Sequence, residues 1–247
     1  MIEVKDLEKS FGKQKVLDGV SFSIEKGESV VIIGRSGGGK SVLLKHLIAL
    51  LQPDAGEVLI EGENIVAMNE RQLLRVRRKF GMLFQGAALF DSLSVKENIA
   101  FAFRRDRSLP EEEIAKRVAH VLELVDLPGI EDKNPSELSG GMRKRVGLAR
   151  AIVYQPEIVL YDEPTTGLDP IASDSIDKLI LRVRDRLDVT SVVVTHDMRS
   201  ARRLGQRILM LHDKRIYAAG TADQIFQSQD PVVRQFVEGV SDVKELN

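Results

Sequence analysis

The segment from Gly34 to Ser41 most constrains the fold of this chain. It reads Gly-Arg-Ser-Gly-Gly-Gly-Lys-Ser and matches G-x-x-x-x-G-K-[ST], the pattern of a phosphate-binding loop. A short apolar run at 29–33 precedes it, and apolar residues at helical spacing follow over 42–48. Strand, glycine turn and helix is the order that such a loop requires, because the helix N-terminus and the loop amides hold phosphate together. A glycine-rich turn with an unrelated lysine is the alternative, and both flanks argue against it.

The residue types of the loop predict its chemistry. The glycines let the backbone close around a polyphosphate without Cβ clashes. Lys40 is expected to reach the β- and γ-phosphates of a nucleotide, and the hydroxyl of Ser41 is expected to bind Mg²⁺.

Composition excludes several other classes of protein. The chain has 247 residues and 43% hydrophobic residues, which suits one globular domain with a full core. It has no cysteine, so disulfides and thiolate metal sites are excluded. The formal net charge of -1 gives no reason to expect nucleic acid as a partner. With a charged N-terminus and only short apolar runs, we expect a soluble cytoplasmic chain whose membrane role comes through a partner.

Strand-like and helix-like patterns alternate along most of the chain, which predicts a mostly parallel sheet with helices on its faces. Residues 1–30 alternate like strands, and the pattern from about 93 to 154 is helical, as in an inserted subdomain. We expect further strands over 57–60, 80–85, 157–162, 190–195 and 208–211, and helices over 69–79, 142–153, 173–187 and 199–204.

Polar motifs follow several of these predicted strands. Asp162 and Glu163 end a buried strand, where ligands of parallel sheets bind, so Asp162 is placed for Mg²⁺ and Glu163 for polarising a water. Gln85 and His196 also end strands. Each has a plainer interpretation, because acids after a strand often form a solvated turn and a histidine there is more often structural.

Leu-Ser-Gly-Gly at 138–141 precedes a predicted helix. Its hydroxyl and glycine amides at a helix N-terminus could form a second phosphate site. The alternative is a simple helix cap by Ser139.

In their joint order, with Gly-Leu-Asp at 167–169, these motifs resemble the ATP-binding-cassette (ABC) ATPases from Phe11 to about Gly220. Leu-Ser-Gly-Gly within a helical insert separates that family from other classes with a P-loop. The resemblance implies an α/β P-loop NTPase with a RecA-like parallel-sheet core, an N-terminal antiparallel β part and an inserted α-helical subdomain. It divides a single domain, 1–247, into a core at about 1–86 and 155–220, a helical subdomain at about 87–154 and a C-terminal extension at about 221–247.

The resemblance also implies site roles. Phe11 would stack on the adenine of ATP, Glu163 would be the general base, and His196 would contact the γ-phosphate. Gln85 would touch Mg²⁺ and the lytic water. The expected catalytic residues are Lys40, Gln85, Glu163 and His196; the expected Mg²⁺ ligands are Ser41, Gln85 and Asp162; and the expected ATP contacts are Phe11, Gly34, Arg35, Ser36, Gly37, Gly38, Gly39, Lys40, Ser41, Val42, Ser139, Gly140, Gly141 and Asp169.

In this family the Leu-Ser-Gly-Gly segment of one chain faces the ATP bound by another. Ser139 and Gly141 would therefore contact the γ-phosphate of the opposite subunit, and Asp169 would organise the dimer interface. Because the chain holds one set of motifs, we expect two copies, or a copy and a second ATPase, to close head to tail around two ATP.

Several stretches are similar to the ATPase subunits of Mce-type lipid transporters, and of the bacterial Mla phospholipid transporters in particular. They are Arg35 and Val42 in the P-loop, the segment 83–93, Met142 and the run 165–170. This resemblance implies transport of phospholipid through membrane permease subunits with an Mce-type lipid-binding subunit, at the cytoplasmic face of the bacterial inner membrane, in maintenance of the outer membrane. Phe11, where tyrosine is usual, keeps an aromatic face, so no catalytic group is lost.

Other functions stay open. The same catalysis would serve an amino-acid or metal-chelate importer. A soluble assembly-factor ATPase would need no permease, but such factors often carry paired cassettes or large insertions that this chain lacks. A regulatory module without turnover is disfavoured by the intact Lys40, Asp162, Glu163 and His196.

Two further segments have two interpretations each. The partly apolar segment 87–100 is either subdomain core or a groove for a helix of the membrane subunit. The tail after Thr221 is expected to be a short helical extension with some interface role.

Overall fold

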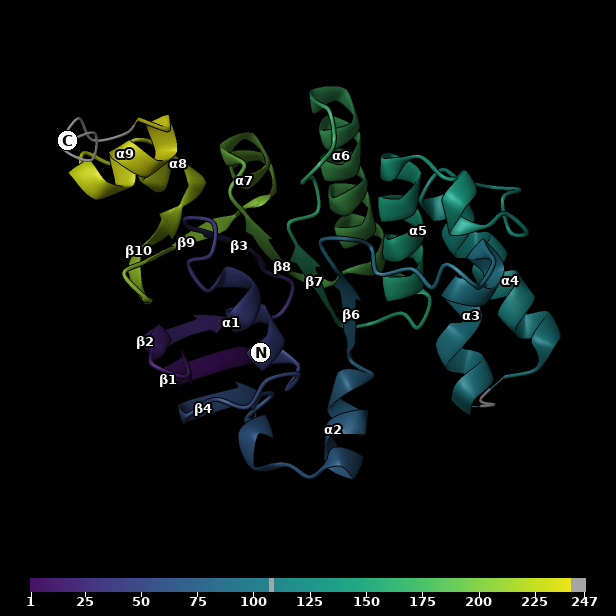
Figure 1. Ribbon diagram of the computed structural model, residues 1–247, viewed down its shortest axis with the longest axis horizontal. Coiled ribbons are helices and arrows are strands. Elements are labelled where there is room, and N and C mark those ends of the chain that lie inside the picture. The colour runs from purple at the N-terminus through teal and green to yellow at the C-terminus, as the bar shows by residue number, and fades with distance from the viewer. Residues whose placement is uncertain (107–108, 241–247) are drawn as a thin grey trace. The chain divides into compact units, whose positions relative to one another are not determined.

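The structure is a computed structural model that describes residues 1–106 and 109–240, the last three of the first range by backbone alone (Figure 1). The chain forms two compact units, one of Met1–Val76 with Val192–Asn247 and one of Arg77–Ser191. Among the described residues, no helix combines the length and apolarity needed to cross a membrane.

The first unit opens with an antiparallel sheet, as predicted. Its strands are β1 (Ile2–Phe11), β2 (Gln14–Ile24), β4 (Ala55–Ile60) and β5 (Glu63–Asn64), in the order β2-β1-β4-β5 (Figure 1). Inward residues of β1 such as Ile2, Val4 and Leu7 are fully buried, which is why this strand alternates in sequence.

The same unit also holds parallel strands. β3 (Ser29–Ile33), which is buried throughout, pairs in parallel with β9 (Arg207–His212), and β10 (Arg215–Thr221) pairs antiparallel with β9. β8 (Thr190–Thr195) contributes its last four residues to this unit. The helical elements are α1 (Lys40–Leu47), the 3-10 turn at Ile65–Ala67, α2 (Glu70–Arg77) up to Val76, α7 (Met198–Leu204), α8 (Ala222–Phe226) and α9 (Pro231–Glu238).

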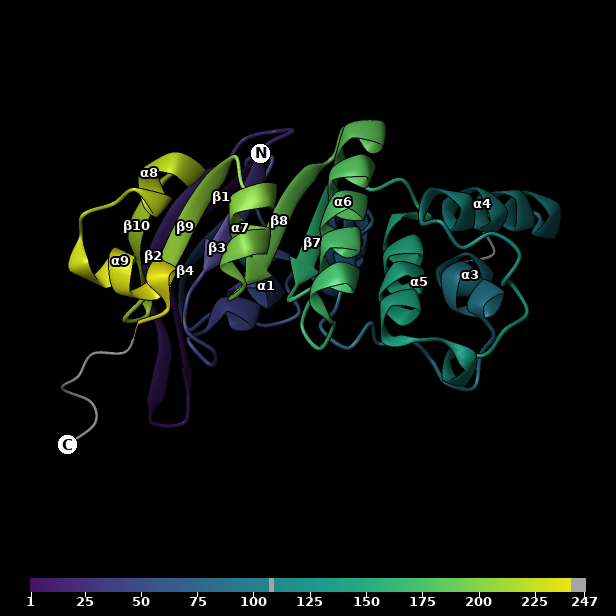
Figure 2. The ribbon, with the colours of Figure 1, turned by 90° about the horizontal axis from the view of Figure 1, so that it is seen from above.

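The second unit pairs β6 (Phe80–Leu83) in parallel with β7 (Ile158–Asp162). Its helical elements are α3 (Val95–Asp106), α4 (Glu111–Leu124), a 3-10 turn at Pro135–Glu137, α5 (Gly140–Ile152) and α6 (Pro170–Leu187). Figure 2 shows α5 beside α6, with α3 and α4 packed on the other side of α5. The antiparallel sheet, the parallel strands and the run of helices confirm the predicted fold class.

Some predicted bounds differ from those observed. The strand predicted over 80–85 ends at Leu83, because the Ala87 N–H donates to the Phe84 carbonyl and turns the chain. α6 begins at Pro170 rather than at 173, since Asp169 caps it and proline fits the first turn of a helix. Strand β10 was not predicted. α8 and α9 confirm that the C-terminal extension is helical up to Glu238, while 241–247 lie outside the described residues. The subdomain boundaries stay predictions.

Candidate functional site

The predicted phosphate loop lies between β3 and α1 in the first unit, and its backbone requires glycine. Gly39 caps α1 with φ +98°, and a Cβ there would lie 3.0 Å from Cγ1 of Val16. A Cβ on Gly34 would lie 2.5 Å from the Leu211 carbonyl oxygen. The loop therefore runs against β2 and β9 with no space for side chains at these two positions. Gly39 also offers no side-chain oxygen to the first N–H groups of α1, which suits a helix start that receives an anion.

Lys40 is folded over this loop. Its side chain is buried, and its ammonium donates to the carbonyl oxygens of Gly34 at 2.8 Å and Arg35 at 3.1 Å. The positive charge therefore lies against the turn that phosphates would occupy. Ser41, on the next position of α1, is half-buried.

The first unit also carries two predicted contacts outside the loop. Phe11, the last residue of β1, is 47% exposed, so its ring face is open to a planar ligand. The Lys9 ammonium lies 5.6 Å from the centroid of that ring. His196 follows β8 directly and is exposed, and Asp197 after it caps α7 by accepting from the Arg199 N–H at 2.8 Å.

In the second unit, Asp162 and Glu163 lie where β7 ends, and both are buried. The Thr166 hydroxyl donates to the Glu163 carboxylate at 3.1 Å. Glu163 has φ +49°, a left-handed conformation that a non-glycine residue rarely adopts. The side chain of Glu163 is therefore aimed by a strained backbone as well as by Thr166.

Lys144 of α5 joins this acidic pair and was not predicted. Its ammonium donates to the Glu163 carbonyl at 3.3 Å and, by a short contact, to the Gln85 carbonyl. Burial lowers the pKa of Lys144, and the nearby Asp162 and Glu163 carboxylates partly oppose this by favouring the ammonium. A signal was present in the sequence, since Lys144 shares a helix face with the apolar Leu148 and Ala151.

Gln85 lies in a tight turn two residues after β6 and is exposed. Ala87 and Ala88 of this turn have φ +59° and +50°. The Arg150 guanidinium of α5 donates to their carbonyls at 2.7 Å and 2.8 Å, respectively. The strained turn is thus held from α5.

The Leu-Ser-Gly-Gly segment forms the start of α5, two residues before the helix start predicted from the sequence. The Ser139 hydroxyl accepts from the Met142 N–H at 3.3 Å, so the capping alternative raised for Ser139 is what this structure shows. Asp169 caps α6 in the same way, accepting from the N–H groups of Ile171 and Ala172 at 2.9 Å each. Ile171, beside it, is 84% exposed.

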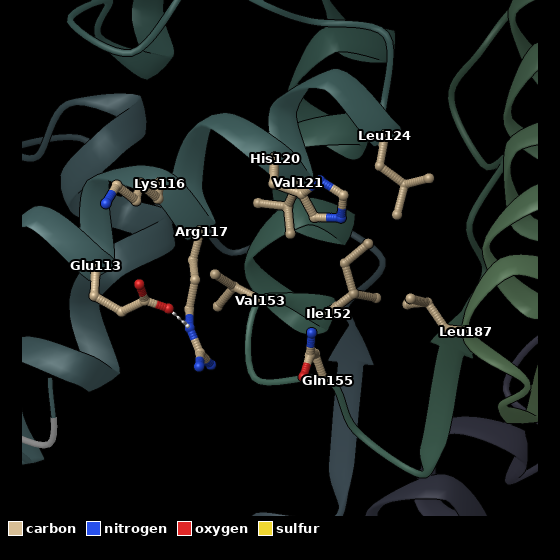
Figure 3. A pocket seen from close by; sticks show the side chains of 10 residues that line it. All are labelled: Glu113, Lys116, Arg117, His120, Val121, Leu124, Ile152, Val153, Gln155 and Leu187. Carbon is tan, nitrogen blue, oxygen red and sulfur yellow. Dashed lines mark hydrogen bonds and ion pairs between the residues drawn. The ribbon is translucent and has the colours of Figure 1, made fainter.

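A separate pocket of about 210 Å³ lies beside α4 (Figure 3). It is lined by Glu113, Lys116, Arg117, His120, Val121, Leu124, Ile152, Val153, Gln155 and Leu187. Arg117 donates to Glu113 at 3.1 Å and Lys116 to Glu112 at 2.8 Å, which offsets the cationic charge at its rim. The pocket includes none of the residues predicted to bind ATP.

Comparison with known proteins agrees with this reading of the motifs. A profile of the ABC transporter family matches residues 17–166. The chain is 44% identical to the probable ribonucleotide transport ATP-binding protein mkl of Mycobacterium leprae, over 96% of this chain and 69% of that protein. It is 42% identical to the intermembrane phospholipid transport system ATP-binding protein MlaF of Haemophilus influenzae, over 98% of this chain and 92% of that protein.

A solved structure is also similar. It is the dimeric post-hydrolysis state of the ATP-binding cassette MJ0796 bound to ADP and Pi, with a TM-score of 0.82 and 33% identity, over 90% of this chain and 99% of that chain. The P-loop, the Leu-Ser-Gly-Gly helix and the acidic strand end of this chain are thus found in a fold known to hold nucleotide. The chain belongs to the ABC transporter family, as one of its ATP-binding, ATP-hydrolysing cassettes.

Proposed function

We propose that this chain is the ATPase subunit of a transporter that moves phospholipid through a membrane permease. The observation that carries the proposal is the 42% identity to a phospholipid transport ATP-binding protein over 98% of this chain. The match is not limited to the ATP motifs, because it includes the segment after Gln85 and the C-terminal helices. The proposed place of work is the cytoplasmic face of the bacterial inner membrane, with an Mce-type lipid-binding subunit in the assembly.

For hydrolysis, we propose ATP with Mg²⁺ as the substrate complex. In the first unit the P-loop amides and Lys40 bind the phosphates, Phe11 stacks on adenine, and His196 contacts the γ-phosphate. Ser41, Asp162 and Gln85 supply hydroxyl, carboxylate and amide oxygens, which are the donor types that Mg²⁺ prefers. Bound there, Mg²⁺ would neutralise charge on the phosphates.

Glu163 is proposed as the general base. Its carboxylate would accept a proton from the attacking water while Thr166 holds the other side of the group at 3.1 Å. Glu163→Gln keeps the size of the side chain and removes the base, so turnover should fall by about 100-fold or more while ATP binding persists. Glu157→Gln is the matched control, since Glu157 is a half-exposed carboxylate near the start of the same strand. Turnover of Glu163→Gln within twofold of the native rate would remove Glu163 from this role.

The active form is proposed to be a head-to-tail pair of this chain around two ATP. Ser139 is exposed at the start of α5, and Ile171 is a large apolar side chain left in solvent beside Asp169. Exposed apolar groups of this kind suit a surface that a partner covers. With ATP and Glu163→Gln, light scattering should show a dimer that reverts to monomer when nucleotide is removed, whereas a monomer at saturating ATP would contradict the pair.

The permease is proposed to contact the surface around Phe90 and Phe101. Their ring centroids lie 4.7 Å apart, and both rings are more than two-fifths exposed. Ala87, Val95 and Ile99 of the same stretch are buried, so the two interpretations of segment 87–100 apply to different residues. An exposed aromatic pair can receive the apolar face of a partner helix.

Affinity purification from detergent-solubilised membranes, followed by mass spectrometry, tests the cargo. A multi-pass permease with an Mce-type subunit would support phospholipid transport, and Phe90→Ala/Phe101→Ala should lose that permease while keeping ATP turnover. A permease with a small-solute binding protein would move the cargo to amino acids, metal chelates or nucleotides. Recovery of soluble proteins alone would favour an assembly factor.

A further inference from the structure

One face of α5 grips the turn that follows β6. Along this face lie Lys144, Gly147 and Arg150, spaced three residues apart. A Cβ on Gly147 would lie 2.9 Å from Cδ1 of Leu83 and 3.1 Å from Cβ of Ala87, so the helix approaches the turn as closely as backbone allows. Lys144 and Arg150, on either side of that contact, donate to carbonyls of the turn.

Lys144 differs from Arg150 in having a second partner. Arg150 contacts the turn at Ala87 and Ala88, whereas the Lys144 ammonium also donates to the Glu163 carbonyl at 3.3 Å. Lys144 is 5% exposed, and removing an ammonium from water is costly unless hydrogen bonds replace the lost hydration. A methionine of similar length would fill the same space without that cost. The charge is therefore explained by the two carbonyls that it binds, and not by packing.

These two carbonyls belong to residues with roles in the proposed mechanism. Gln85 is the expected contact to the lytic water, and Glu163 is the expected base. Glu163 has a left-handed backbone, so a tether on its carbonyl acts on the peptide group that orients its side chain. The amide and the carboxylate that must face one water are thus connected through one ammonium.

We propose that Lys144 is a positioning residue for hydrolysis, which ties the Gln85 turn to Glu163 and so makes the aim of the base depend on α5. This rests on the proposed role of Glu163. Because α5 begins at Ser139, a movement of the Leu-Ser-Gly-Gly segment would reach the base through Lys144. A movement of the turn beside Phe90 would reach the base by the same ammonium.

The first test compares kcat with KM in the full chain. Lys144→Met should lower kcat for ATP hydrolysis by about 10-fold to 100-fold, because misplacing a reacting group by about 1 Å has effects of this size. The KM for ATP should stay within about twofold, since Lys144 is not placed in the phosphate loop. Lys144→Arg, which keeps the charge and can donate to both carbonyls, should restore most of kcat. Lys116→Met is the control, because Lys116 is an exposed lysine on α4 of the same unit.

The second test asks whether Lys144 acts through Glu163. In single-turnover measurements with radiolabelled ATP, adding Lys144→Met to Glu163→Gln should lower the residual rate by less than about twofold. Multiplicative losses would instead mean that Lys144 acts independently of the base, which overturns the proposal. A native kcat in Lys144→Met, or a raised KM with unchanged kcat, would overturn it too.

Folding and mechanism can be separated from these results. Thermal unfolding shows whether Lys144→Met is folded, and if it is not, Lys144→Arg carries the same kcat-against-KM test. If Glu163→Gln alone keeps its turnover, then the proposed base is wrong. If Glu163→Gln is inactive and Lys144→Met is fully active, then only the positioning role of Lys144 is wrong.

Discussion

Two helices of this molecule, α1 and α5, begin after glycine-rich segments, and both starts are expected to meet phosphate. They are built differently. α1 follows Gly39, which is left-handed and has no side chain, whereas α5 follows Ser139, which is extended and whose hydroxyl accepts from the Met142 N–H at 3.3 Å. The start of α1 leaves its first turn to a ligand, while the start of α5 satisfies part of its own first turn.

The difference bears on when each helix can bind. At α1, the loop amides and the Lys40 charge are already gathered in one chain, so ATP binding needs no second subunit. At α5, the Ser139 hydroxyl is engaged with its own helix and would have to turn towards the γ-phosphate of another chain. We therefore expect changes at α1 to affect ATP affinity and changes at the start of α5 to affect turnover.

The largest effect is expected from Lys40→Ala. The ammonium makes charge-assisted hydrogen bonds to phosphate, worth about 1.5–3 kcal/mol each, so ATP affinity should fall by about 100-fold or more and turnover should be lost. Titration with a fluorescent ATP analogue measures the affinity. An affinity within threefold of the native value would break the comparison, because the α1 start would then not be the primary phosphate site.

Alanine at two glycines should give opposite results. Gly39→Ala places a side chain at φ +98° and against Val16, so we expect a loss of about 1–2 kcal/mol in stability and weak ATP binding. Gly141→Ala meets nothing within 4 Å and lies inside α5, so the melting temperature should be unchanged or higher. ATP affinity of Gly141→Ala should stay native, with turnover reduced where the opposite phosphate approaches closely. Weak ATP binding by Gly141→Ala in the monomer would contradict the contrast.

Ser139→Ala should have a moderate effect. Losing the cap costs about 1 kcal/mol of stability, and loss of the hydroxyl should lower turnover without changing ATP affinity. Thr221→Ala is a matched control, because the Thr221 hydroxyl caps α8 by accepting from the Gln224 N–H at 3.3 Å. Calorimetry and steady-state hydrolysis distinguish the two variants: equal losses of turnover would mean that Ser139 acts only as a cap.

Asp18→Asn should have the smallest effect and checks that the stability of the first unit does not by itself set ATP affinity. Lys15 and Arg215 hold the pKa of the Asp18 carboxyl at about 2, below its ordinary 3.8. Since the folded pKa is the lower one, the stabilisation is present above pH 3.8 and is lost as pH falls towards 2. The native chain should therefore melt slightly higher than the variant at pH 7, with the difference vanishing near pH 2. Unequal ATP affinities at pH 7 would show that this surface pair influences the loop.

Local patterns predicted much of this structure. The P-loop could be recognised because its strand, glycines and helix are neighbours in sequence, and β8 was predicted with its observed bounds for the same reason. Strand β10 was missed because Arg215–Thr221 is half-buried at most and contains Ala-Ala-Gly in place of branched residues. The contacts of Lys144 depend on two segments that are 59 and 19 residues away, so no local pattern could reveal them.

The left-handed backbone of Glu163 has a consequence for how this protein tolerates change. At φ +49°, glycine or asparagine would relieve conformational strain that glutamate retains. Selection or design for thermostability alone would therefore favour Glu163→Gly, giving a hardier chain that binds ATP and no longer hydrolyses it. In this chain the most active sequence and the most stable sequence are different sequences, and they diverge at a single peptide.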